Sequence, residues 1–221
     1  MNYVTSVALW GLTTDEMVEV VERERMDGII WSYEQLKQLN ERPERMKRQH
    51  ESSSLRFALD GPSDLNLCAV NETIRRHSMK EAKRAIEWAR TLGVDWLRFD
   101  AGNESMTPAL RQWQRRTMQQ AVYELDVAAS RAGVVIAFGL QLPSPDALFA
   151  RAERLNGLVK HCSPHVVTIA NGSNDESRRL ERVIGTEVSE RIERRDVRGD
   201  ALFYGTWEAC QKGALPLMPN G

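Results

Sequence analysis

Short apolar runs alternate with amphipathic helical patterns along most of this chain, with a repeat of roughly 30 residues. A strand–helix–strand order implies a parallel sheet, because a helix commonly carries the chain back to the edge where the previous strand began. The runs are almost wholly apolar, which is typical of strands covered on both faces. The sequence therefore predicts an α/β protein with strands at residues 7–10, 28–31, 55–59, 94–99, 134–138 and 166–169.

Signals for helix ends lie between these runs. Capping boxes at 13–16 and 78–81, and Thr107 followed by Pro108, predict three helix starts. Gly93 and Gly133 stand where two of the helices should end. Further helices are expected over 33–50, from Ser144-Pro145 onward, and over 174–188, where Asn174 would be the N-cap and apolar residues recur at helical spacing.

Two architectures fit this order, an open doubly wound sheet and a closed (β/α)8 TIM barrel. No G-x-G-x-x-G follows the first strand and no Walker A sequence occurs, so the main reason to favour an open nucleotide-binding sheet is missing. We expect a compact barrel in a single domain, residues 1–221. Residues 191–196 and 201–204 are candidates for the seventh and eighth strands, and a poor helical pattern near 215–219 predicts an irregular or incomplete end to the barrel.

Composition narrows the classes of partner. The 30 basic and 31 acidic residues are interleaved and give a net charge of −1, which does not favour a nucleic-acid partner. Three scattered cysteines predict neither a disulfide framework nor a structural zinc site. Without a signal peptide or a run of about 18 apolar residues, we expect a cytoplasmic protein with no membrane partner. A small-molecule substrate is expected, and pairing with a second copy of the chain stays open.

Residues 59–67, LDGPSDLNL, resemble the turn after the third strand in the xylose-isomerase-like TIM barrels, and 73–102 and 120–141 are similar to the segments that follow it. This superfamily contains sugar-phosphate isomerases and epimerases and AP-endonuclease-like proteins. The similarity extends over residues 4–196. It implies a TIM barrel, and a divalent metal held at the strand ends by two glutamates, an aspartate and a histidine.

The chain departs from this ligand pattern. The resemblance sets Gly139 and Ala170 where the family has its strand-five glutamate and strand-six aspartate, and Ser173 where it has a histidine. On strand seven it sets Glu193 in place of a histidine and keeps Asp196. For the last glutamate, Glu208 is the only candidate. We therefore expect no metal site of the usual type and no cofactor, with Mn²⁺ or Mg²⁺ at Asp60, Asp100 and Asp196 left open.

Polar and aromatic residues at the predicted strand ends are the candidates for chemistry, because the C-terminal mouth of a barrel holds the active site. Asp60, Asp100 and Asp196 are predicted to be catalytic; their alternatives are a turn residue for Asp60 and a structural ion pair with Arg98 for Asp100. The predicted substrate-binding residues are Trp10, Trp31, Arg98, Gln141, Asn171 and Glu208. Core packing is the alternative for both tryptophans, and capping of loop backbone for Gln141 and Asn171.

These residues support three hypotheses. The first is an isomerase, epimerase or related lyase that acts on a polyhydroxylated or carbonyl compound, with Asp60 and Asp100 moving the proton. The second is a non-catalytic barrel that binds a ligand or a partner, which the missing metal ligands favour. The third, an AP-endonuclease-like enzyme, would need several metals and a basic groove, and the sequence indicates neither.

Overall fold

The computed structural model describes residues 2–100, 102–141, 146–169, 179, 183–184, 187–189, 191–195 and 201–205. Strands and helices alternate up to β6. The elements are β1 Asn2–Thr5, the 3-10 helix η1 Ser6–Leu9, α1 Thr14–Arg23, β2 Gly28–Ser32, α2 Tyr33–Gln38, α3 Pro43–Ser52, β3 Arg56–Asp60, α4 Glu72–Leu92, β4 Leu97–Phe99, α5 Pro108–Ala132, β5 Ile136–Gly139, α6 Ala152–Val159 and β6 Val166–Ile169. Four short strands follow: β7 Val183–Ile184, β8 Glu187–Ser189, β9 Arg191–Arg195 and β10 Ala201–Gly205.

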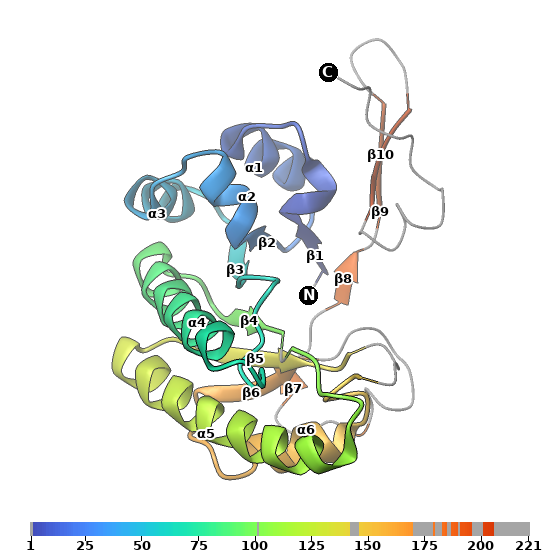
Figure 1. The fold of residues 1–221 in the computed structure, drawn as a ribbon. Helices are drawn as coiled ribbons and strands as arrows, with labels where there is room; N and C mark the ends of the chain where they lie inside the picture. The colour runs from blue at the N-terminus through green and yellow to red at the C-terminus, as the bar shows by residue number, and fades with distance from the viewer. Residues whose placement is uncertain are drawn as a thin grey trace.

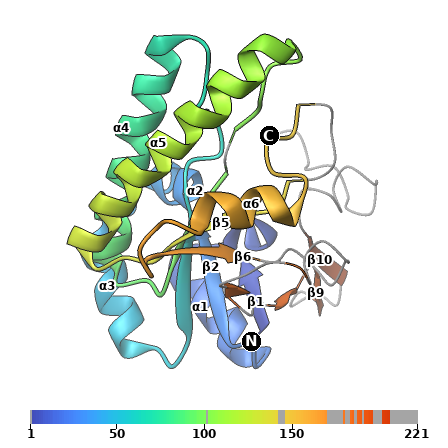
Figure 2. The same ribbon diagram turned by 90° about the horizontal axis from the view of Figure 1, so that it is seen from below.

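Eight strands form one sheet in the order β7-β6-β5-β4-β3-β2-β1-β8, and all the neighbouring pairs are parallel. The helices lie outside the strands, with α4 and α5 side by side (Figures 1 and 2). This confirms the predicted α/β fold class. No helix in the described ranges is both long enough and apolar enough to cross a membrane.

A short stretch of chain, residues 183–189, supplies the strands at both edges of the sheet. β7 pairs with β6, and β8, which starts three residues after β7 ends, pairs with β1 (Figure 1). The chain therefore passes from one edge of the sheet to the other within residues 183–189. The prediction of a helix over 174–188 is wrong at these positions. Its apolar spacing fits a helix, but Val183, Ile184 and Val188 are β-branched and serve equally well in short strands.

The strands predicted near 191–196 and 201–204 exist as β9 and β10, but they are not the last barrel strands. They pair antiparallel with each other in a separate two-stranded sheet, in which Arg195 lies opposite Ala201. Figure 1 shows this pair standing apart from the barrel sheet. The irregular end expected for the barrel is therefore observed, but its strands come from an earlier part of the chain.

The first strand also lies earlier than predicted. Residues 2–5 form β1, whereas Val7–Trp10 was the predicted strand; Ser6–Leu9 is a 3-10 helix whose N-cap, the Thr5 hydroxyl, accepts a hydrogen bond from the Ala8 amide. Short apolar runs do not distinguish a strand from a tight buried turn.

Several helix ends follow the predicted signals, and two do not. The capping box of Thr13 and Glu16 is complete, and Gly93 and Gly133 end α4 and α5 with φ of 70° and 67°. However, α4 begins six residues before Ser78, with Asn71 as its N-cap. The helix expected from Ser144-Pro145 begins at Ala152, and Ser144 and Pro145 lie outside the described residues.

Residues 33–50, predicted to be helical throughout, form two helices. α2 ends at Gln38 and α3 begins at Pro43, with Asn40 between them at a φ of 51°. The left-handed backbone at Asn40 interrupts a helix, and asparagine tolerates it better than most residues do.

Alternate residues of the strands pack into two separate clusters. Residues that face outward pack under the helices and form most of the core, including Ile29, Leu59 and Phe138. Residues that face inward fill the barrel, and these are Tyr3, Ile30, Ala58, Trp96, Ala137 and Ile169. The strand period of two places Asp60 and Arg98 on the inward face as well, one step beyond Ala58 and Trp96 toward the mouth.

Candidate active site

An ion pair between Asp60 and Arg98 lies inside the barrel at the C-terminal ends of β3 and β4. The two residues are register partners on neighbouring strands. Asp60 Oδ1 lies 2.8 Å from Arg98 Nε, and Asp60 Oδ2 accepts a hydrogen bond from Arg98 Nη2 at 3.0 Å. The Asp60 side chain is 21% exposed and that of Arg98 is 27% exposed, so the pair is sheltered but reachable.

The carboxyl group of Asp60 is electrostatically perturbed. Burial raises its pKa above the ordinary value of 3.8, and the negative charges of Asp100 and Glu34 act in the same direction. Arg98 opposes this by favouring the carboxylate, and the balance is a raised pKa. The Oδ1 atom is also buried without a well-aligned hydrogen bond from any described residue. A perturbed carboxyl at a strand end is a candidate for proton transfer.

Asp100 lies close enough to Asp60 to influence its charge, but it is not the partner of Arg98 that the two-residue spacing suggested. Asp100 follows β4 directly and is exposed, whereas Arg98 turns to Asp60 on the neighbouring strand. The alternative of a structural Arg98–Asp100 pair is therefore not observed.

The loops after β3 and β4 are fastened to each other beside this pair. Gly61 donates its N–H to Arg98 O at 2.8 Å, and a Cβ at this position would lie 2.8 Å from the same oxygen. Gly102, with φ of 78°, approaches Asn66 so closely that a Cβ would lie 2.7 Å from its Cα. The Asn66 amide donates to Asn103 O at 3.3 Å. Two glycines thus permit the close packing that fixes the mouth.

Gln141 lies after β5 and uses both ends of its amide on backbone. Its Nε2 donates to Gly102 O at 2.9 Å, and its Oε1 accepts from the Phe149 N–H at 2.9 Å. This is the loop-capping role that the sequence left as the alternative. Gln141 ties the loops after β4 and β5 together, while its side chain stays partly exposed.

The two tryptophans occupy different environments. Trp10 follows η1 and is 45% exposed, so its ring is available to a ligand. Trp31 is fully buried under the helices, where Nε1 donates to His50 Nε2 at 3.0 Å. Trp31 therefore has the core position that was its alternative, and substrate binding by Trp31 finds no support in this placement.

Asp196, Asn171 and Glu208 lie outside the described residues, as do Ala170 and Ser173. The residues just before Asp196 belong to β9, which pairs with β10 and not with a strand of the barrel sheet, and the role of Asp196 stays a prediction. Gly139, by contrast, is the last residue of β5, as the resemblance implied.

A second aspartate–arginine pair closes the opposite end of the barrel interior. Arg56 Nε, at the start of β3, lies 2.7 Å from Asp95 Oδ2. The Tyr3 hydroxyl donates to the same oxygen at 3.4 Å. The two pairs are chemically alike, but only Asp60–Arg98 lies at the end where barrel chemistry is found.

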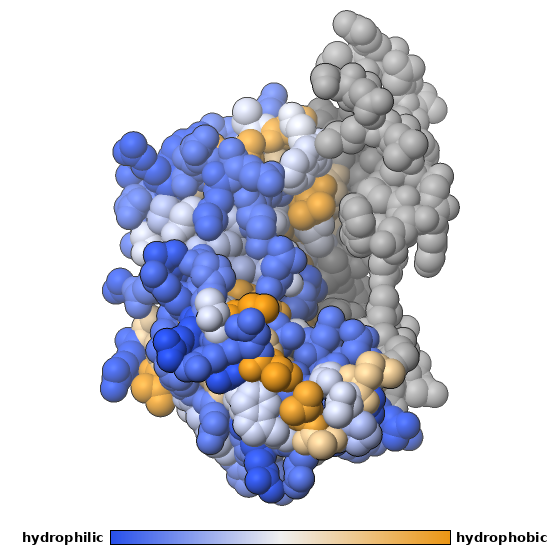
Figure 3. All heavy atoms as spheres, in the orientation of Figure 1, coloured by the Kyte–Doolittle hydropathy of each residue, from blue (hydrophilic) through white to orange (hydrophobic). Residues whose placement is uncertain are grey.

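Exposed apolar side chains gather near the starts of α4 and α5. Figure 3 shows a mainly hydrophilic face with an apolar patch over the starts of α4 and α5. Exposed residues of this region include Val70, Ile74 and Met106, and the Trp113 ring lies 5.1 Å from the Arg75 guanidinium.

Solved structures with this fold were found, although no family model and no curated protein matches the chain. A D-tagatose 3-epimerase-like protein matches with 19% identity and a TM-score of 0.61, over 76% of this chain and 64% of its own. The IOLI protein with a binding zinc atom matches with 16% identity and a TM-score of 0.70, over 86% of this chain and 73% of its own. A 3-keto-D-glucoside 4-epimerase from E. coli matches with 16% identity and a TM-score of 0.67, over 82% of this chain and 77% of its own.

The chain has the fold of the xylose isomerase-like TIM barrels. The predicted fold is thereby confirmed. The chain spans less than two thirds of the D-tagatose 3-epimerase-like protein. At these identities the match establishes the fold alone.

The described residues show no cluster of metal-ligating side chains. No group of three or more histidine, cysteine, aspartate or glutamate side chains comes together among them. His50 and His77 lie in α3 and α4, and His161 and His165 lie between α6 and β6. We therefore assign no step to a metal, and the Mn²⁺ or Mg²⁺ option with Asp196 stays a prediction.

Sequence reasoning missed two acidic residues near the mouth. Glu34, at the start of α2, accepts a hydrogen bond from the Ser63 N–H at 2.8 Å and adds to the negative field at Asp60. Glu104, after β4, is buried with a side chain 2% exposed and is bound by Arg115. A glutamate eleven residues before an arginine gave no sequence signal, because the pairing depends on how the loop folds back.

Proposed function

We propose that the barrel mouth is the active site of an isomerase or epimerase for a small polyhydroxylated carbonyl compound. The observation that carries the proposal is the state of the Asp60 carboxyl group. It lies inside the mouth beside Arg98, burial raises its pKa, and its buried Oδ1 accepts no well-aligned hydrogen bond from the described residues. A base whose pKa is raised toward the working pH transfers protons more effectively than an ordinary aspartate. Related lyase chemistry begins with the same proton abstraction.

In this proposal the Asp60 carboxylate removes the proton from the carbon next to the substrate's carbonyl group, leaving an enolate. Asp60 then holds the proton, and Asp100 is the proposed second proton-transfer group. Return of a proton to the opposite face of the same carbon gives the epimer, and return to the neighbouring carbon gives the isomer. Arg98 keeps Asp60 oriented and offers positive charge close to the developing oxyanion. Trp10, Gln141 and Asn171 are the proposed contacts for the substrate's ring or hydroxyl groups, with Glu208 and Asp196 as predictions still open.

Exchange with deuterium oxide tests the proposal. Proton NMR of ketohexoses, ketopentoses and their phosphates in deuterium oxide would show loss of the signal next to the carbonyl when the protein abstracts that proton. Asp60→Asn should lower the exchange rate at least 100-fold. Asp95→Asn is the matched control, since it alters the similar pair at the other end of the barrel, and it should retain activity. Equal losses in both variants would contradict the assignment.

A non-catalytic binding barrel is the second candidate, and one observation favours it. Arg98 already donates a hydrogen bond to the Asp60 carboxylate, and the Gln141 amide is hydrogen-bonded to backbone through both its nitrogen and its oxygen. These polar groups of the mouth therefore bind other parts of the protein. On this alternative a sugar of the same panel shifts the NMR signals of the protein without deuterium exchange. A cytoplasmic location and pairing with a second copy also stay predictions; the buried free thiols of Cys68 and Cys162 are compatible with a reducing compartment.

A further inference from the structure

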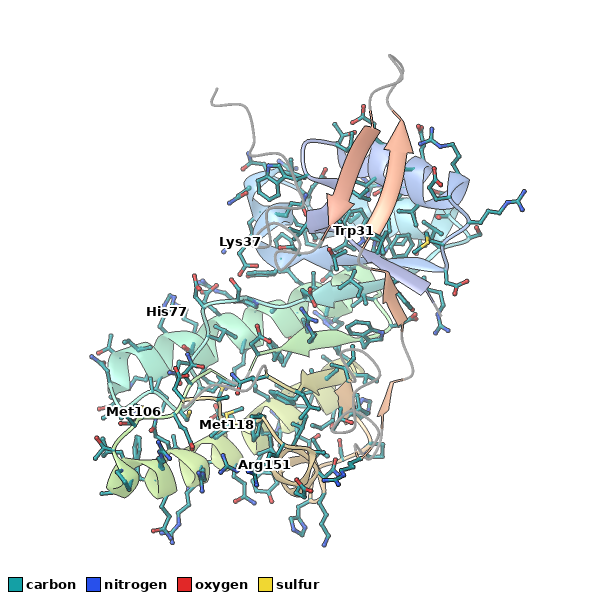
Figure 4. The ribbon with its side chains drawn as sticks, turned by 90° about the vertical axis from the view of Figure 1, so that its right-hand side faces the viewer. Trp31, Lys37, His77, Met106, Met118 and Arg151 are labelled. Carbon is teal, nitrogen blue, oxygen red and sulfur yellow. The ribbon has the colours of Figure 1, made fainter. Side chains whose placement is uncertain are left out.

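A pocket outside the barrel combines buried apolar side chains with two guanidinium groups. It lies between α5 and α6 and has a volume of about 190 Å³. Its apolar lining includes Met118, Leu148, Phe149 and Leu158, all of which are buried. Arg115 of α5 and Arg154 of α6 line the same pocket, and Figure 4 labels Met118 together with Arg151, the residue just before α6.

Three arginines near this pocket contact the same carboxylate, that of Glu104. Arg115 binds Glu104 through both Nε and Nη2, at 3.1 and 3.0 Å. Arg111 Nε and Arg154 Nη1 lie 3.9 and 3.6 Å from Glu104 Oε1. Among the described residues, three guanidinium groups thus share one carboxylate, which leaves two positive charges in excess within this group.

Among these arginines, Arg154 makes the weakest contacts through its guanidinium group, so it can still donate hydrogen bonds to a ligand. Its contacts with described residues, to Glu104 and to Leu148 O, both involve Nη1 and are 3.5 Å or longer. An arginine carries five N–H donors in a planar fork that matches a carboxylate or a phosphate. The Arg154 side chain is 43% exposed, so an anion can reach it from solvent.

The size of the pocket limits the apolar part of a ligand. An apolar cavity of about 150 Å³ holds a benzene molecule. The space here is therefore sufficient for one ring with a small charged group attached. A Cβ at Gly157, which lines the pocket, would meet no atom within 4 Å, so this side of the pocket is open.

We propose that the pocket between α5 and α6 is a second ligand site, distinct from the barrel mouth, which takes a small organic anion with a ring-sized apolar body. The anionic group lies against Arg154 and Arg115, and the ring packs on Met118 and Phe149. Because the Asp60 chemistry plays no part in this binding, the second site does not depend on the proposed enzymatic function.

Titration calorimetry of the full chain with benzoate tests the proposal. A ligand of this size should bind with a dissociation constant of about 1 mM. Benzyl alcohol tests the need for charge and inorganic phosphate tests the need for the ring, and each should bind at least tenfold more weakly. Phenyl phosphate in place of benzoate shows which anionic group the pocket prefers.

Variants locate the site. Arg154→Gln should weaken benzoate binding at least tenfold, as expected for the loss of a hydrogen bond to a charged group. Gly157→Phe should abolish binding by filling the pocket. Arg151→Gln and Gly157→Ala are the matched controls and should bind as the unchanged protein does. Asp60→Asn should also leave benzoate binding unaltered, which separates this site from the mouth.

Three results would overturn the proposal: no heat of binding up to 20-fold above the expected dissociation constant of about 1 mM, unchanged binding by Arg154→Gln, or an equal loss in Arg151→Gln. The last would indicate attraction of anions to the basic surface in general. Thermal unfolding of each variant establishes that it is folded, and Arg154→Gln decides the question if Gly157→Phe does not fold.

Discussion

His50 of α3 is a half-buried histidine whose ring lies against Trp31 and Phe57. Its Nε2 accepts the Trp31 hydrogen bond and its Nδ1 lies 3.0 Å from Leu92 O, which fits the neutral ring with the proton on Nδ1. The Phe57 ring stacks on it with centroids 3.6 Å apart. Burial lowers the pKa of His50 from 6.5 to about 4. A histidine that protonates at lower pH in the folded state than in the unfolded chain makes stability depend on pH.

We predict that the free energy of unfolding falls by about 3 kcal/mol as the pH is lowered from 6.5 to 4, because the unfolded chain takes up a proton at His50 that the folded chain refuses. His50→Phe should remove this dependence, and should cost about 1–3 kcal/mol at neutral pH by leaving the Trp31 N–H unpaired. Urea unfolding at a series of pH values measures both effects. His77→Gln, on the exposed part of α4, should keep the dependence of the unchanged protein.

Asp60 should have the opposite effect on stability. Its pKa is raised in the folded state, so the folded chain holds its proton more tightly and loses stability as the pH rises above 3.8. We predict that Asp60→Asn gains stability relative to the unchanged protein over this rise and then levels off. Urea unfolding against pH measures the difference, with Asp64→Asn in the exposed part of the same loop as control. A difference that is flat with pH would show that the Asp60 carboxyl is not perturbed.

At this scale the sequence identified Asp60 correctly as a residue at a strand end, because the apolar run and the Gly-Pro turn mark where β3 stops. It did not identify the partner of Asp60. Arg98 and Asp100 share a strand face in the sequence pattern, but the register of β3 against β4 decides the pairing, and a register is set by the whole sheet.

Among the elements, α4 has two candidate N-caps in its sequence, Asn71 and Ser78, and the helix uses the first. Asn71 Oδ1 accepts hydrogen bonds from the Thr73 and Ile74 amides, so the helix starts there. The later capping-box pattern at Ser78 is not used, because Ser78 is buried and its hydroxyl accepts from the Asn66 N–H. Sequence reasoning chose the pattern with the better spacing and missed the cap that the loop after β3 makes available.

We predict that Asn71→Ala lowers the free energy of unfolding by about 1 kcal/mol, through loss of the cap. Asn71→Asp should recover most of this stability, because its carboxylate also accepts from the first-turn amides. Chemical unfolding followed by far-UV circular dichroism measures the three proteins side by side. If alanine and aspartate behave alike, the cap does not stabilise α4.

For the molecule as a whole, the parallel order of the strands was predictable, because each βα unit has its own local pattern of apolar residues and helix caps. The strands that complete the barrel sheet were not predictable. The stretch from 183 to 189 is short, and its pairing with β6 and with β1 joins parts of the chain that are far apart in sequence. β9 and β10, which looked like the closing strands, pair with each other instead. A local pattern cannot distinguish these partners.

Two truncations test which segment closes the barrel. A chain that ends at residue 190 keeps β7 and β8 and loses the β9–β10 sheet, whose β10 contacts η1. We predict that it unfolds cooperatively, with a midpoint close to that of the full chain. A chain that ends at residue 182 also loses β7 and β8, which leaves β1 and β6 as unpaired edges. It should unfold at a clearly lower urea concentration and bind a hydrophobic dye. Equal stability of the two truncated chains would show that 183–189 does not close the sheet, and instability of both would assign that role to β9 and β10.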